Sequence, residues 1–172
     1  MPRKMNLSFS ASMLVFVGIV QLIYRDEILG YFLTPLSRPT AQTVLTLIHL
    51  AGLDAVRIGN LICHPDGFAY DIHYRCTGFL PIAFLIVSIL VCPGGLRTKA
   101  AGLAVGVPLL VVLNLIRLVH LYYVGVHNRA VFDLAHSVLW PGLMIFTVFG
   151  LWIAWKKWAG RQGEVQSSAH NV

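Results

Sequence analysis

Four segments of the chain are almost entirely apolar. They are residues 8–24, 77–96, 100–119 and 134–155. A helix needs about 20 apolar residues to cross a bilayer core, and backbone groups in lipid must form hydrogen bonds within their own segment. None of the four segments contains an acidic residue, and their only lysine or arginine is Arg117. The pattern therefore predicts about four transmembrane helices.

The remaining segments predict smaller elements. Residues 40–53 are apolar but short, and they include threonines and a histidine, which favours an interfacial or re-entrant helix. Residues 54–75 contain a Pro-Asp-Gly turn signal at 65–67 between loosely alternating apolar residues. This arrangement predicts a small extracytoplasmic β-hairpin. The polar residues 161–172 predict a disordered tail.

Composition agrees with a membrane protein of one domain. The chain has 172 residues, of which 57% are hydrophobic and 12% are charged, whereas a soluble domain has about 25% charged residues. The net charge of +6 does not indicate nucleic acid, because no basic run with interleaved aromatic residues is present. We therefore expect an all-α, multi-pass membrane protein with a single domain over residues 1–172, surrounded by lipid and without a nucleic-acid partner.

The basic residues predict how the chain is oriented. All four lysines lie near the first apolar segment, in the turn before residue 100, or after residue 155. An even number of spans brings these places to one side, which the positive-inside rule assigns to the cytoplasm. The first apolar run lacks a small-x-small cleavage site and is interpreted as an uncleaved anchor. The prediction is a cell (inner) membrane protein with both termini in the cytoplasm.

Three chemically capable residues then reach the opposite, extracytoplasmic face. Cys76 immediately precedes the second apolar segment, Arg117 lies near the outer end of the third, and His136 lies near the start of the fourth. Only this face is available for a joint site. An imidazole within reach of a thiol is the minimal arrangement for an activated cysteine.

The position of Cys76 favours a reactive thiol. It lies just before a predicted helix N-terminus, where the helix dipole and unpaired N–H groups stabilise a thiolate. The N–H groups of Thr77 and Gly78 are candidate donors to an oxyanion.

Arg117 and His136 have neighbours that can support them. Asn114 and His120 lie one turn before and one turn after Arg117, so the three are expected on one helix face. A charged arginine at that depth needs a polar partner or cavity. Asp133 precedes His136 by three residues and is a candidate helix cap.

Other interpretations of these residues are open. A cysteine beside a span is usually inert, and an interfacial arginine usually reaches to lipid headgroups. A metal-binding or thiol-redox protein is one alternative, because thiols and imidazoles cluster in the outer segment, although their spacing matches no compact zinc motif. The residues in question are Cys63, His64, His73 and Cys76. A disulfide between Cys63 and Cys76 would block the thiol, and a non-enzymatic membrane assembly factor is the second alternative.

Three short motifs resemble the exosortase/archaeosortase family. They are C-T-G at 76–78, N-L-I-R at 114–117 and the histidine of D-L-A-H-S-V at 133–138. Their order and their placement at the outer ends of consecutive spans are similar to that family over about residues 54–155. Only one span precedes the outer segment, so the chain is most similar to compact members such as the exosortase H-like group.

The resemblance implies a membrane cysteine protease or transpeptidase that needs no cofactor and no metal. Such enzymes act on exported proteins that end in a short motif, a transmembrane helix and a basic cluster. The residues that match the family's site are Cys76 as nucleophile, with Arg117 and His136 completing it. The sequence does not identify the substrate motif or the oligomeric state. It also does not identify the acceptor, which is either water or an amine.

Overall fold

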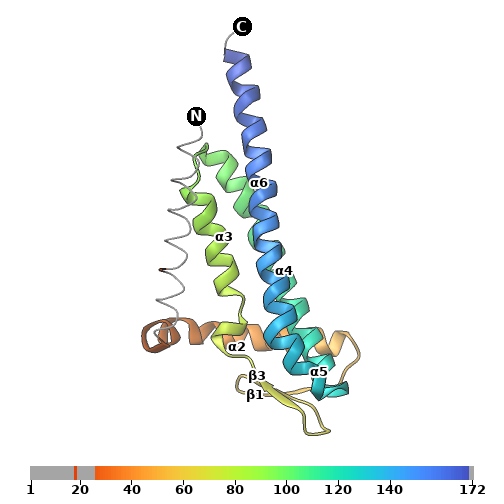
Figure 1. Cartoon of the computed structure of the whole chain (residues 1–172). Helices are drawn as coiled ribbons and strands as arrows, with labels where there is room; N and C mark the ends of the chain where they lie inside the picture. The colour runs from red at the N-terminus through yellow and green to blue at the C-terminus, as the bar shows by residue number, and fades with distance from the viewer. Residues whose placement is uncertain (1–17, 19–25, 171–172) are drawn as a thin grey trace.

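Two long apolar helical stretches run through the fold. The computed structural model describes residue 18 and residues 26–170. Helix α4 (Leu96–His127) is the first stretch. The second begins with α5 (Arg129–Leu134), passes through a π-helical turn, η2 (Ala135–Leu139), and continues as α6 (Trp140–His170), as Figure 1 shows.

Both stretches are long and apolar enough to cross a membrane. They cover Leu96–His127 and Arg129–Gln162, and only 22% and 17% of their most apolar windows are buried inside the protein. Apolar helices that protein does not cover are suited to lipid. The predicted spans 100–119 and 134–155 lie inside these helices, and the predicted span 8–24 lies outside the described residues apart from Gly18.

The predicted span 77–96 contains a shorter helix than expected. Helix α3 (Phe79–Val91) has 13 residues, which extend about 20 Å against a bilayer core of about 30 Å. The left-handed backbone of Gly78 (φ 77°) precedes the helix, and the Pro93-Gly94-Gly95 turn follows it. Two helices among the described residues therefore have spanning length. The predicted span 77–96 overestimated the length of α3, because apolar turn residues count toward hydropathy.

Helix α2 (Asp26–Leu50) begins well before the predicted start at residue 40. It lies across the ends of α3 and α4 in Figure 1. One face is buried, at Leu33, Ser37, Ala41, Val44 and Ile48. Because α2 runs across the direction of α4, a membrane crossed by α4 has α2 along its surface. The expectation of a helix that does not span is consistent with this arrangement.

Residues 54–75, the predicted outer segment, form three short strands where one hairpin was expected. They are β1 (Val56–Ile58), β2 (Leu61–Cys63) and β3 (Ala69–Asp71), in one antiparallel sheet in that order. Ile62 pairs with both Arg57 and Tyr70. The Pro-Asp-Gly turn joins β2 to β3 as predicted. The additional hairpin turns at Gly59, whose φ is +66°, a conformation that favours glycine.

The sheet packs between α2 and the second half of α4. Its buried residues Ile62, Phe68, Tyr70 and Ile72 meet Ala41, Val44 and Ile48 of α2 and Leu118 and Tyr122 of α4. A second cluster joins α3, α4 and α6 through Leu85, Ile89, Cys92, Leu110, Val148 and Trp155. The first cluster, which includes Cys76, holds the sheet segment against α2 and α4 and so positions the candidate site.

Helix α6 continues to His170, so residues 161–170 of the predicted disordered tail (161–172) are helical. Proline is absent after residue 141, and glutamine, glutamate and alanine favour helix. An established helix therefore propagates through this polar stretch.

Gly125 is a test of how tightly the sheet docks on α4. A Cβ at this position would overlap the ring of Phe68. That ring is confined by the rings of Tyr122 and Phe132, at centroid distances of 6.2 and 5.4 Å. We expect Gly125→Ala to destabilise the protein by about 1–3 kcal/mol through overpacking. Thermal unfolding in detergent, followed by near-UV circular dichroism, measures the change.

The matched control is Gly150→Ala in α6, where an added Cβ meets nothing within 4 Å. It should unfold at the wild-type temperature or slightly above it, since alanine favours helix more than glycine. Equal destabilisation by both substitutions would contradict the described docking.

Candidate active site

Cys76 is held in a tight turn that leads into α3. It ends a 3₁₀ helix, η1 (Tyr74–Cys76), and its N–H donates to the carbonyl of His73 at 2.8 Å. The N–H of Thr77 donates to the Tyr74 carbonyl at 3.2 Å, and so does the Thr77 hydroxyl at 2.6 Å. The Thr77 N–H is therefore occupied in this conformation and is not free to donate to an oxyanion.

Asn114 on α4 fixes this turn from the side. Its Nδ2 donates to the carbonyl of Cys76 at 2.9 Å, and the residue is only 2% exposed. Gly78 lies against the same amide, because a Cβ there would be 2.9 Å from Cγ of Asn114. The close approach and the positive φ explain why glycine occupies position 78. Two of the predicted supporting residues thus hold the backbone of Cys76.

Arg117 lies one turn after Asn114 and links the three predicted site residues. It is half-buried, and its Nε is buried without a hydrogen-bond partner in the described part of the chain. Its charge acts on Cys76 and on His136. Arg117 on α4 is therefore close enough to Cys76, at the end of η1, and to His136, on η2, for its charge to act on both.

Two opposing effects set the protonation of Cys76. Burial raises the pKa of its thiol, and the positive charge of Arg117 lowers that pKa again by a smaller amount. The net pKa is above the ordinary value, so the resting residue is a thiol. The thiolate, which is the nucleophile, needs a base or a further stabilising group.

His136 lies on the π-helical turn between α5 and α6. Its ring stacks on that of Phe132, with centroids 5.6 Å apart and planes 7° apart. Single π-helical turns often occur at functional sites. This wide turn orients an imidazole that Arg117 also influences.

Asp133 does not cap a helix, contrary to expectation. It lies inside α5 and is exposed. The cap is Asn128, whose side chain accepts from the N–H of Val131 at 3.3 Å. The helix begins at Arg129, before the apolar run that starts at residue 134.

His120 serves a different contact from the one expected. It is exposed on α4, and its Nδ1 accepts a hydrogen bond from Nε1 of Trp140 at 3.0 Å. The two rings meet edge to face at 5.5 Å. His120 therefore ties α4 to the start of α6, beside the site and without contact to Cys76.

Tyr70 is a neighbour of the site that sequence reasoning missed. Its hydroxyl, carried by β3, donates to the carbonyl of Leu118 at 2.9 Å, next to Arg117. Burial and then the charge of a Cys76 thiolate raise the pKa of Tyr70, so it stays a neutral donor. Only its place in an alternating strand pattern could have indicated it.

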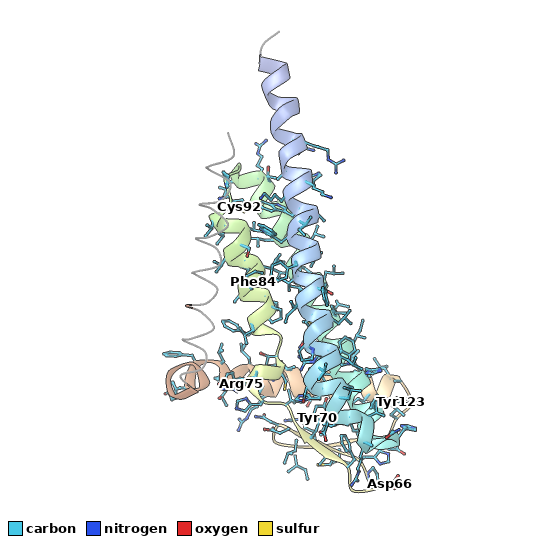
Figure 2. The ribbon with its side chains drawn as sticks, viewed as in Figure 1. Asp66, Tyr70, Arg75, Phe84, Cys92 and Tyr123 are labelled. Atoms are coloured by element: carbon cyan, nitrogen blue, oxygen red, sulfur yellow. The ribbon has the colours of Figure 1, made fainter. Side chains whose placement is uncertain are left out.

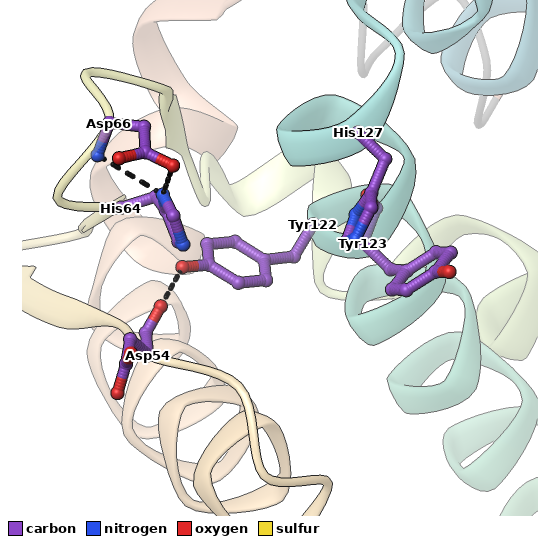
Figure 3. A network of polar contacts seen from close by, with 6 residues as sticks. All are labelled: Asp54, His64, Asp66, Tyr122, Tyr123 and His127. Atoms are coloured by element: carbon purple, nitrogen blue, oxygen red, sulfur yellow. Dashed lines mark hydrogen bonds and ion pairs between the residues drawn. The ribbon is translucent and has the colours of Figure 1, made fainter.

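The alternative metal site is not assembled. Among the described residues, no three His, Cys, Asp or Glu side chains are grouped so that they could hold a metal ion. His64 instead pairs with Asp66, at 3.4 Å, as Figure 3 shows. Cys63 and Cys76 are both free thiols, so the disulfide considered from the sequence is not formed.

The contacts in Figure 3 have a structural role. The hydroxyl of Tyr122 on α4 donates to the carbonyl of Asp54, at the start of the outer segment. The ring of Tyr122 also faces that of His64, with centroids 6.2 Å apart. This network attaches the segment that carries the sheet to α4.

Comparisons with known proteins agree with the motifs. A sequence model of a family described as transmembrane exosortase matches residues 6–155. That range includes all the described elements from α2 to the middle of α6. No curated protein and no solved structure matches the chain.

The pKa of Cys76 gives a direct test of the site's electrostatics. With Cys63→Ser and Cys92→Ala as background, Cys76 is the only thiol. The rate at which iodoacetamide alkylates it follows the thiolate fraction. This rate should rise with pH, with a midpoint at higher pH than for an ordinary cysteine. Arg117→Gln removes the charge that lowers the pKa, so the curve should move to higher pH. Arg117→Lys keeps a charge and should move it less. Coincident curves for all three proteins would contradict the interaction.

Proposed function

Because the chain belongs to the transmembrane exosortase family, we propose that it is a membrane cysteine peptidase or transpeptidase with Cys76 as its nucleophile. Its substrates are exported proteins that end in a short motif, a transmembrane helix and a basic cluster. It works in the cell membrane, with both termini in the cytoplasm and the site at the extracytoplasmic surface.

One observation carries the proposal more than any other. Arg117 lies one turn after Asn114, whose side-chain amide donates to the carbonyl of Cys76, and its charge reaches both Cys76 and His136 from a separate element. A structural arginine in lipid would be expected to pair with a carboxylate or reach the headgroups. Arg117 instead has a buried Nε without a partner among the described residues, beside a free thiol. A thiol, an imidazole and a guanidinium can supply the nucleophile, the base and the oxyanion donor of acyl transfer.

The first half of the reaction forms a thioester. His136 accepts the proton of Cys76, and the sulfur attacks the carbonyl carbon of the scissile peptide bond. Arg117 donates hydrogen bonds to the oxygen as it becomes negative. The carbon–nitrogen bond then breaks, His136 returns its proton to the leaving amine, and the C-terminal part of the substrate departs with its membrane helix.

The second half releases the product. Water or an acceptor amine attacks the thioester carbon, with His136 taking the proton, and the sulfur of Cys76 leaves as a thiolate stabilised by Arg117. Water gives a free carboxylate and an amine gives a new amide, so the mass of the product distinguishes the two reactions.

The geometry around Cys76 suits this role in two respects. Asn114 and the left-handed Gly78 fix its backbone at the start of α3, so its position costs little ordering when a substrate binds. Its high resting pKa protects the thiol from oxidation until substrate and His136 meet it.

Replacement of Cys76 in the native host tests the proposal. We expect Cys76→Ala to lower processing at least about a thousandfold, as loss of a nucleophile does. Precursors with an intact C-terminal helix and basic cluster should accumulate in the membrane fraction. Quantitative mass spectrometry of C-terminal peptides measures them, with the abundance of the variant protein checked in the same sample.

Cys63→Ala is the matched control, because it removes another free thiol from the neighbouring sheet. It should process precursors like the wild type. Normal processing by Cys76→Ala, or an equal loss with Cys63→Ala, would exclude Cys76 as the nucleophile.

A further inference from the structure

A basic cavity lies at the end of the molecule far from Cys76. It is formed by the turn between α3 and α4, the first turn of α4, and α6, and Figure 2 marks this place with Cys92. The cavity has a volume of about 590 Å³. Its polar lining residues are Arg97, Thr98, Lys156 and Gln162.

Protein does not neutralise this cavity in the described part of the chain. Arg97 and Lys156 carry its charges, no carboxylate lines it, and no ion pair involves either residue. Lys156 lies over the ring of Trp152, 5.0 Å from its centroid. The described acidic side chains belong to the outer segment and α5, at the opposite end. The cavity therefore complements an anion.

An apolar groove adjoins the cavity along the helices. It has a volume of about 270 Å³ between α3, α4 and α6, with Ile89, Val105 and Leu151 among its lining residues. Trp155 lines both spaces. Its Nε1 donates to the carbonyl of Thr98 at 3.0 Å, and its ring packs on Gly102. Trp155 is therefore held in place where the basic cavity and the apolar groove meet.

We infer that one anionic phospholipid occupies both spaces, with its phosphate between Arg97 and Lys156 and an acyl chain in the groove beside Trp155. Basic pockets at the ends of transmembrane helices commonly bind such headgroups. A soluble phosphate would leave the apolar groove unused. A substrate's basic cluster would be repelled by the same two charges. Binding of the lipid does not depend on the chemistry of Cys76.

Tryptophan quenching in vesicles tests this site. The full-length protein is reconstituted in phosphatidylcholine with increasing fractions of phosphatidylglycerol, and either lipid carries brominated acyl chains. We expect brominated phosphatidylglycerol to quench at lower fractions than brominated phosphatidylcholine. Each basic residue near an anionic headgroup contributes about fivefold, so Arg97→Gln/Lys156→Gln should reduce this preference roughly 25-fold.

The chain offers a matched control in Lys157→Gln/Arg161→Gln. Lys157 and Arg161 are exposed at the same end of α6 but do not line the cavity. Their substitution removes the same amount of charge as the cavity variant. The control should keep the wild-type preference. An equal loss in both double variants would overturn the proposal in favour of diffuse attraction to the membrane surface. Equal quenching of the wild type by both lipids, or full displacement by glycerol phosphate, would also overturn it, whatever the variants do.

Discussion

The hydrogen bond from Asn114 to the carbonyl of Cys76 connects the two halves of this fold. On one side is the outer segment, which ends in the turn at Cys76; on the other is α4, which carries Arg117 one turn further. The bond is fully buried, where a lost partner costs more than at the surface. It ties the Cys76 turn directly to the helix that bears Arg117.

The packing around that bond explains why the outer segment is ordered. Its three-residue strands are too short to be stable alone. They become stable because the sheet's buried face meets α2 and α4, and because Tyr70 and Tyr122 form hydrogen bonds to the backbone across that contact. The same contacts keep β3, and with it the chain leading to Cys76, at a fixed distance from Arg117.

The candidate site is therefore set by a conflict between burial and charge. Desolvation favours the neutral thiol of Cys76, whereas the guanidinium of Arg117 favours the thiolate. The site lies at the boundary between apolar helices and a small polar cap, where both effects act on Cys76. A site made entirely of loop residues would have weaker desolvation, and one deeper among the helices would not admit a polar substrate. At the other end of the molecule, basic side chains line an open cavity, so the polarity of the two ends differs.

Hydropathy alone was enough to predict α4 and the helical stretch that contains His136. Long apolar runs must satisfy their backbone hydrogen bonds internally in lipid, so this conclusion follows from local composition. The Pro-Asp-Gly turn was equally local. Tertiary contacts decided the rest. Helix α2 passes through Pro35 and Pro39 because its buried face packs on the sheet. His120 turns to Trp140, Asp133 is replaced as a cap by Asn128, and Tyr70 enters the site from a strand. These outcomes depend on which side chains meet across elements distant in the chain, and no periodicity within one segment contains that information.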